Sequence, residues 1–454
     1  MIKLRPNQED AVDFIYANDN TLVLAPVGAG KTAIAQTAIR EFLTTGIVKR
    51  FLVLAPKRVC TDVWAQEAAK WMPGVSIRIA VGTPIDRMEA FESPSKVVVI
   101  NYDNLDWLCA KNPKLLAGFD GVVYDELTKL KNPSGTRFKA WFKHIDQFKI
   151  RIGLTGSFTS NGLEDCFGQC KVVDQRLLGR AKGAFLQQYF HCLDREKSIY
   201  EPRESALADV MKRIKPAVFM IDNQTYKNTL PPLRIVEMRC DMGDRKPYEK
   251  MKKDLAYEFP TAKIVAQNAA VVSGKLRQMA SGFIYETTKV PNPNTPGKFI
   301  ITQRPLWLSD HKFDMLAEIL EENHRAPTIV VYNFQEELAE LQRRYPSAET
   351  IDRPRVIVRW NKGEVPLLLI HPKAAGHGLN LQFGGSKMIF ISLPWSQEEY
   401  EQTLGRLHRS GQENAVYAYL LLTRNTIDER VLAALGDKRE MSNLALEELQ
   451  MENV

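Results

Sequence analysis

Residues 21–42, TLVLAPVGAGKTAIAQTAIREF, carry the strongest structural signal in this chain of 454 residues. An apolar run at 21–26 is followed by a turn with two glycines and then by a helical pattern over 33–45. A short strand that leads into a glycine-containing loop and a helix is the context in which such a loop holds phosphate. The stretch therefore predicts an α/β fold with a nucleotide site at the end of this strand.

The loop APVGAGKT (25–32) contains residue types that suit ATP and Mg²⁺. Gly28 and Gly30 let backbone N–H groups close around phosphate oxygens, and the following helix directs its positive end at the same anion. Lys31 is expected to reach the β- and γ-phosphates, and the Thr32 hydroxyl to hold Mg²⁺. The other loop residues assigned to ATP binding are Pro26, Val27 and Ala29. The alternative is a glycine turn without a ligand.

An acidic pair in YDELT (124–128) ends another apolar run, GVVYDE at 121–126. Asp125 can hold Mg²⁺ through water, and Glu126 can orient or deprotonate the attacking water. An acidic pair at the end of a strand can also be an ordinary loop start. A phosphate-binding loop on a neighbouring strand favours the catalytic interpretation.

Apolar runs elsewhere extend this pattern and then repeat it. In the first part of the chain they lie at 51–56, 96–100 and 150–156, and in the second part at 328–334, 366–370, 386–392 and 416–422. Helical patterns lie between several of them, at 59–71, 311–323, 335–344, 397–405 and 426–435. Short buried strands separated by helices are typical of parallel sheets. We therefore expect two α/β lobes.

A different pattern separates the two sets of strands. Residues 163–228 and 241–285 look largely helical and carry many Lys and Arg, whereas VPNPNTPGK (290–298) predicts a loop at the tip of a hairpin. We divide the chain into a first lobe with a helical extension, a second lobe with a helical insertion at about 241–300, and a polar tail. Their bounds are 1–228, 229–436 and 437–454.

The stretch QTLGRLHRSGQ (402–412) contributes a pair of arginines. Arg406 and Arg409 are three positions apart, which predicts one face of a helix. Guanidinium groups stabilise the charge that develops during phosphoryl transfer, and a solvated basic face is the alternative. The flanking glycines, Gly405 and Gly411, suggest close approach to another surface, which favours a role as arginine fingers.

Composition sets limits on compartment and partners. The net charge of +7 permits a local nucleic-acid-binding patch. Cys166 and Cys170 form the closest cysteine pair, so buried thiols are expected rather than a zinc site. No run of about 18 apolar residues occurs, and the N-terminal residues lack the apolar core of a signal peptide. We expect no membrane partner and a location in the cytoplasm, or in the nucleus of a eukaryote.

Six motifs, in a characteristic order, make the chain similar to a known family. They are LRPNQ (4–8), GAGKT (28–32), DELTKLKN (125–132), LTGS (154–157), AGHGLNL (375–381) and GRLHRSGQ (405–412). This order resembles superfamily-two helicases, and LHRSGQ is typical of their Swi/Snf chromatin-remodeller branch. NTLPPL (228–233) and KLRQMASGF (275–283) also resemble the inter-lobe region of that branch. The resemblance implies two RecA-like lobes, ATP and Mg²⁺ as cofactors, and double-stranded or branched DNA as the partner of a monomer.

The resemblance also implies roles for further residues. Gln8 would read adenine through its side-chain amide, although it could instead be an ordinary surface residue. Thr155, Gly156 and Ser157 would link hydrolysis to lobe movement. The residues implied for nucleic-acid contact are Lys57, Arg58, Asn101, Tyr102, Gly376, Asn380 and Trp395. Each could be structural instead, with Trp395 in the core and Lys57 a solvated charge.

Three departures from the family pattern bear on mechanism. The acidic motif reads DELT rather than DEAH, which places a hydroxyl, Thr128, at its fourth position. LTGSF replaces LTGTP at 154–158, and IDNQTY at 221–226 stands where many relatives carry a basic RRTK-like stretch. Coupling through Thr128 is therefore expected to differ, and the family's phosphate-sensing or brace role is not carried over to 221–226.

The chain is accordingly predicted to be a DNA-dependent ATPase that moves along double-stranded DNA and remodels DNA or protein–DNA structures. One alternative keeps the ATPase but makes it a strand-separating helicase. The other is an ATP-gated clamp that binds branched DNA and recruits a partner without moving.

Overall fold

The computed structural model describes residues 3–156, 158–159, 162–194, 199–221, 226, 230–259, 262–265, 269–291, 299–353, 355–375 and 379–437. The chain forms two compact units, of which the first takes the residues up to Thr229 and the second most of Leu230–Gly436. In the part of the chain just given, no helix is long and apolar enough to cross a membrane.

The first unit is built on a parallel sheet of seven strands in the order β3-β4-β2-β5-β6-β1-β9. Its strands are β1 Asn20–Leu24, β2 Phe51–Ala55, β3 Ile77–Ala80, β4 Val97–Asn101, β5 Gly121–Asp125, β6 Ile150–Thr155 and β9 Val218–Met220. All five strands predicted for this lobe are present. The two that the sequence pattern missed, β3 and β9, lie at the edges of the sheet, where partial exposure interrupts the apolar run.

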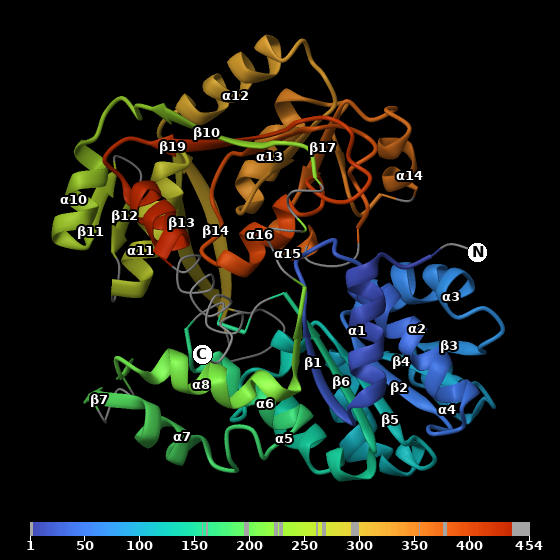
Figure 1. Cartoon of the computed structure of the whole chain (residues 1–454). Coiled ribbons are helices and arrows are strands. Elements are labelled where there is room, and N and C mark those ends of the chain that lie inside the picture. Colours follow the sequence, from blue (N-terminus) through green and yellow to red (C-terminus); the bar gives the residue numbers. More distant parts are fainter. Residues whose placement is uncertain are drawn as a thin grey trace. The chain divides into compact units, whose positions relative to one another are not determined.

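Helices connect these strands and cover the sheet. They are α1 Pro6–Ala17, α2 Lys31–Thr44, α3 Ala65–Trp71, α4 Pro84–Glu92, α5 Thr136–Phe142, α6 Asp165–Val173, α7 Lys182–Tyr189 and α8 Ala206–Ile214. A π-helical turn, Val59–Trp64, precedes α3, and a hairpin of β7 Phe190–Asp194 and β8 Ile199–Pro202 follows α7. In Figure 1, α1 and α2 pack together beside β1, while α6 packs on β1 and β6.

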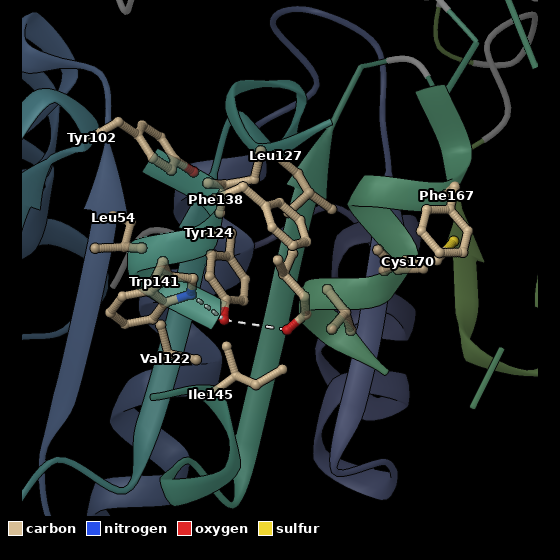
Figure 2. Close-up of a cluster of buried hydrophobic side chains, with 14 of the residues drawn as sticks. Leu54, Tyr102, Val122, Tyr124, Leu127, Phe138, Trp141, Ile145, Phe167 and Cys170 are labelled. Carbon is tan, nitrogen blue, oxygen red and sulfur yellow. Dashed lines mark hydrogen bonds between the residues drawn. The ribbon is translucent and has the colours of Figure 1, made fainter. Parts of the chain in front are cut away.

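One side of this sheet is covered by an aromatic core that joins three elements (Figure 2). The indole N–H of Trp141 on α5 donates to the hydroxyl of Tyr124 on β5 at 3.0 Å. That hydroxyl donates in turn to the backbone carbonyl of Val172 on α6 at 3.3 Å. Both rings are fully buried, so their polar atoms need these partners. The core thereby fixes the position of β5, which ends in the acidic motif.

The second unit has a parallel sheet of six strands in the order β10-β19-β18-β15-β17-β16. Its strands are β10 Leu233–Cys240, β15 Thr328–Val331, β16 Glu349–Thr350, β17 Leu367–Ile370, β18 Lys387–Phe390 and β19 Val416–Thr423. Its helices are α12 His311–Glu322, α13 Gln335–Arg344, α14 Val356–Asn361, α15 Pro372–Ala375 and α16 Gln397–Leu404, with a further helix over 427–437. Two parallel-sheet lobes confirm the predicted fold class.

The insertion in the second unit is less helical than its composition indicated. It has two helices, α10 Lys246–Asp254 and α11 Ala269–Ala280. It also has two antiparallel hairpins, β11 Ala256–Phe259 with β12 Ala262–Val265, and β13 Phe283–Pro291 with β14 Phe299–Trp307. The Lys and Arg content hid the β-branched and aromatic residues that form β13 and β14. Their antiparallel pairing is the arrangement that the predicted hairpin requires, although 292–298 lie outside the described residues.

Candidate active site

The phosphate-binding loop lies between β1 and α2, as the sequence predicts. Gly28 and Gly30 have φ values of 84° and 88°, a left-handed conformation that residues with a side chain rarely adopt. At Gly30 a Cβ would also lie only 2.3 Å from Nε2 of Gln8. Both conformation and space therefore require glycine at position 30.

Lys31, the first residue of α2, turns its ammonium group back to the start of the loop. Its Nζ donates to the carbonyl of Ala25 at 2.8 Å and to that of Pro26 at 3.2 Å. Thr32 follows it and is half-buried. A lysine and a hydroxyl at a helix N-terminus suit a phosphate and its metal ion.

Gln8 lies against this loop, and its side chain is buried. The side-chain carbonyl accepts from the backbone N–H of Arg5 at 2.9 Å, and Nε2 donates to the carbonyl of Ala29 at 2.8 Å. The guanidinium of Arg5 donates to the same carbonyl at 3.2 Å. Gln8 is thus not an ordinary surface residue, since it holds the loop from α1. Its contact with adenine stays a prediction.

Asp125, at the end of β5, is buried with 6% of its surface exposed. The indole N–H of Trp64 donates to its Oδ2 at 2.8 Å, and the hydroxyl of Tyr102 donates to its backbone carbonyl at 2.9 Å. Burial raises the pKa of Asp125, while the hydrogen bond from Trp64 and the charge of Lys31 act in the opposite direction. A carboxylate and a hydroxyl are oxygen donors of the kind Mg²⁺ prefers, so Asp125 and Thr32 fit the expected ion.

Glu126 adopts a left-handed backbone conformation, with φ of 66°. Such strain in a residue other than glycine is uncommon and gathers at functional sites. The Thr128 hydroxyl donates to Oε1 of Glu126 at 3.2 Å. The hydroxyl that distinguishes DELT from DEAH therefore orients the proposed catalytic carboxylate.

The strand order corrects one expectation about this site. β1 and β5 are not neighbours, because β6 lies between them and pairs with both. Since parallel strands end at one edge of a sheet, the phosphate-binding loop and Asp125 still share that edge. Thr155, at the end of β6, pairs with Leu24, and its carbonyl accepts from the backbone N–H of Ala25 at 3.1 Å. Gly156 follows, and Ser157 lies outside the described residues.

The arginine motif of the second unit also departs from the prediction. Because α16 ends at Leu404, Arg406 and Arg409 lie in the turns that follow and not on one helix face. Arg406 is buried and Arg409 half-buried. Gly411, with φ of 93°, terminates these turns, and a Cβ there would lie 3.2 Å from the ring of Phe383.

Hydrogen bonds fix this arginine loop (405–412) to the segment 381–385 of the same unit. The backbone N–H of Leu381 donates to the carbonyl of Arg406 at 3.3 Å. Nε2 of Gln412 donates to the carbonyls of Gln382 and Gly385, both at 2.9 Å. Two motifs that lie apart in sequence therefore form one structural block.

The predicted nucleic-acid residues divide by burial. Lys57 and Asn380 are exposed and Arg58 is half-buried. Trp395 is 46% exposed, so the alternative that it belongs to the core is wrong. Asn101 and Tyr102 are buried, with 4% and 3% exposed, and the Tyr102 hydroxyl serves Asp125. Gly376 lies outside the described residues.

Sequence reasoning did not identify Trp64 as part of the site. Its partner, Asp125, is 61 residues away, and an aromatic residue at helical spacing is normally assigned to the core. For Tyr102 the family resemblance implies nucleic-acid contact, and the structure adds a hydrogen bond from its hydroxyl to the backbone carbonyl of Asp125. No local pattern carries either hydrogen bond.

This chain is similar to two protein-domain families, to curated proteins and to a solved structure. The DEAD/DEAH box helicase family matches residues 5–165, and the helicase conserved C-terminal domain matches residues 311–411. Protein p41 of Acyrthosiphon pisum secondary endosymbiont phage 1 is 30% identical to this chain, over 98% of each. The alignment of the Sulfolobus solfataricus SWI2/SNF2 ATPase core in complex with dsDNA covers 100% of this chain and 98% of that one, with a TM-score of 0.46 and 17% identity.

Two longer relatives have named functions. Protein CHROMATIN REMODELING 25 of Arabidopsis thaliana is 25% identical over 98% of this chain, and DNA repair and recombination protein RAD54-like of Drosophila erecta is 22% identical over the same share. The chain spans 55% and 63% of their respective lengths.

The matched domains are the paired ATPase domains of superfamily-two helicases. The chain belongs to the Swi/Snf-type ATPases of that superfamily.

Proposed function

We propose that this protein is a DNA-dependent ATPase that translocates on double-stranded DNA and remodels DNA or protein–DNA structures. The observation that carries the proposal is the shared edge of β1 and β5, where Lys31, Asp125 and Glu126 gather. Family membership supports ATP as substrate, and the names of the longer relatives support DNA as partner. We assign ATP hydrolysis and movement on DNA to two functional domains, residues 1–228 and 229–436, and we regard residues 437–454 as a tail.

The proposed hydrolysis follows from the chemistry of the gathered residues. Backbone N–H groups of Gly28–Thr32 and the ammonium of Lys31 bind the phosphates. Thr32 and Asp125 hold Mg²⁺, which would neutralise phosphate charge when bound. Glu126 accepts a proton from the attacking water. Arg406 and Arg409 are proposed to supply further positive charge to the γ-phosphate during the reaction.

DNA contact is proposed for residues that are exposed or half-buried. Lys57, Arg58, Asn380 and Trp395 meet that condition, and Gly376 is retained from the family motif. Asn101 and Tyr102 would act indirectly, since they are buried beneath the surface. Contacts to phosphates position a protein without reading sequence. A monomer acting in the cytoplasm or nucleus fits this proposal.

The test measures ATP hydrolysis at one salt concentration with duplex DNA, with RNA of equal length and without nucleic acid. We expect duplex DNA to give the highest rate. Lys31→Ala should abolish turnover, and Glu126→Gln should abolish it while still binding ATP. A higher rate with RNA, or full activity of Glu126→Gln, would contradict the proposal.

One observation favours the second candidate, a strand-separating helicase. The β13–β14 hairpin pairs nine residues on each strand, and Phe299 on it is 63% exposed. An exposed aromatic side chain on a long hairpin can stack on bases. A triplex-displacement assay and a blunt-duplex unwinding assay, run on the same preparation, separate the two functions. Translocation without strand separation predicts activity only in the first assay.

A further inference from the structure

Two aromatic donors from separate segments hold Asp125 from two sides. Trp64 binds the carboxylate at Oδ2, and Tyr102 binds the backbone carbonyl. Both side chains are buried, Trp64 completely. A buried carboxylate that accepts a hydrogen bond from a rigid indole has few orientations left, because rotation about its side-chain bonds would break that bond.

Trp64 is itself fixed by the helix that begins at the phosphate-binding loop. Gln36 on α2 is fully buried, and its Nε2 donates to the backbone carbonyl of Trp64 at 3.0 Å. Trp64 ends the π-helical turn Val59–Trp64, and such turns occur frequently at functional sites. The chain of contacts therefore runs from α2 through Trp64 to Asp125.

We propose that Trp64 is a positioning residue that holds Oδ2 of Asp125 and so orients the carboxylate for the metal ion of the bound nucleotide. The inference rests on the proposed ATPase function. Hydrogen-bond partners that orient a metal-binding carboxylate contribute to metal affinity, although they do not touch the metal themselves. The competing explanation is that Trp64 only fills the core, in which case its shape matters and its N–H does not.

The experiment therefore changes the N–H and preserves the shape. Benzothienylalanine at position 64 replaces the indole N–H with sulfur in a ring of nearly the same size, and Trp64→Phe is the simpler companion. The full chain is titrated with a fluorescent ADP, once with EDTA and once with saturating Mg²⁺. The ratio of the two affinities measures how well the site holds Mg²⁺, without reference to turnover.

In both position-64 variants, we expect the ratio of ADP affinity with Mg²⁺ to ADP affinity with EDTA to fall about 10- to 100-fold. This is the usual effect of removing a partner that orients a metal ligand. Their affinity in EDTA should match that of the unchanged protein. Trp71→Phe is the matched control, because the indole N–H of Trp71 on α3 also donates to a carboxylate, that of Glu67, at 2.8 Å. Its ratio should not change.

An unchanged ratio for the benzothienylalanine variant would overturn the inference. This variant decides the question even where Trp64→Phe fails to fold. Tyr102→Phe should lower the ratio less, because its hydroxyl serves a neutral carbonyl. If the unchanged protein shows no tightening by Mg²⁺, the proposed ATPase function fails instead, so the two failures are distinguishable.

Discussion

At the scale of single residues, Thr128 shows how a departure from the family pattern can be accommodated. A histidine in the fourth position of the motif would place a ring where this chain has a short hydroxyl. That hydroxyl donates to Glu126, whose left-handed backbone already restricts its side chain. Orientation of the proposed general base is therefore local, and one β-branched residue provides it.

Removing this hydroxyl should slow the chemical step. Thr128→Val keeps the shape of the side chain, and a hydrogen bond to a carboxylate contributes about 1.5 kcal/mol or more, so kcat should fall about tenfold. KM for ATP should stay unchanged because Glu126 is proposed to act on the attacking water and not on ATP. Steady-state kinetics at saturating DNA measure both. A raised KM with normal kcat would instead assign Thr128 to nucleotide binding. Thr45→Val, which removes an exposed hydroxyl on the same unit, is the control and should change neither constant.

Arg409 permits a paired measurement of hydrolysis and DNA binding. Arg409→Ala should cut ATPase activity at saturating DNA by about 10³, or roughly 4 kcal/mol, the lower end of the range for arginine fingers. DNA affinity without nucleotide should change little, because DNA contacts are proposed to be spread over many residues. Weak DNA binding with near-normal turnover would place Arg409 in the DNA-binding surface.

At the scale of elements, α6 supports the segment that follows the acidic motif. It does so through Gly168, where a Cβ would lie 2.0 Å from the carbonyl of Lys131. Lys131 also pairs with Asp165 at the start of α6, at 3.1 Å. Close backbone approach and an ion pair thus join α6 to the end of DELTKLKN.

Gly168→Ala should separate these elements. Overpacking of this kind costs about 1–3 kcal/mol, so the thermal midpoint should fall, and kcat should fall with it because β5 leads into this segment. Gly183→Ala on α7 is the matched control, since among the described residues no atom beyond its chain neighbours and its own helix backbone lies within 4 Å of its Cβ position. Equal thermal midpoints for the two variants would show that α6 can move away from Lys131 without loss of stability.

In the second unit, His311 joins the insertion to the sheet. Its Nε2 lies 3.1 Å from the carbonyl of Ala280 on α11 and 2.9 Å from Oγ1 of Thr423 on β19. Burial lowers the pKa of His311 to about 4, and the charge of Lys312 acts in the same direction. His311 is therefore neutral in the folded chain at physiological pH.

The lowered pKa sets the sign of a pH dependence. The unfolded chain binds a proton at His311 near pH 6.5 and the folded chain only near pH 4. The contribution of neutral His311 to the free energy of unfolding is therefore fully present above pH 6.5. It is lost as the pH falls towards about 4. Thermal midpoints at pH 7 and pH 5 should differ less in His311→Gln than in the unchanged protein. If the midpoint difference between pH 7 and pH 5 were the same in His311→Gln and in the unchanged protein, His311 would not cause the pH dependence. His191→Gln, at an exposed histidine, is the control.

At the scale of the whole molecule, a net charge of +7 makes salt the natural probe of DNA contact. Each phosphate contact contributes about −0.9 to the slope of log affinity against log salt concentration. We expect the same slope for unrelated duplex sequences, and a slope shallower by about 0.9 after Lys57→Ala. Lys114→Ala, at another exposed lysine of the first unit, should leave the slope unchanged. An unaltered slope for Lys57→Ala would exclude that contact.

The amino-acid sequence by itself determined the central strands, the phosphate-binding loop and the order of the motifs. These are local properties, because a buried central strand is a continuous apolar run and a left-handed loop position demands glycine. The sequence pattern did not predict edge strands such as β3, β9 and β10, because partly exposed strands contain polar residues that interrupt the apolar run.

Only the tertiary structure decided which side chains serve the site. Trp64 reaches Asp125 across 61 positions, Gln8 reaches Ala29 across 21, and Tyr102 turns inward to Asp125 instead of outward. The end of α16 at Leu404 likewise removed Arg406 and Arg409 from a helix that their spacing had indicated. Each outcome depends on packing between distant segments, and the residue types alone allow either result.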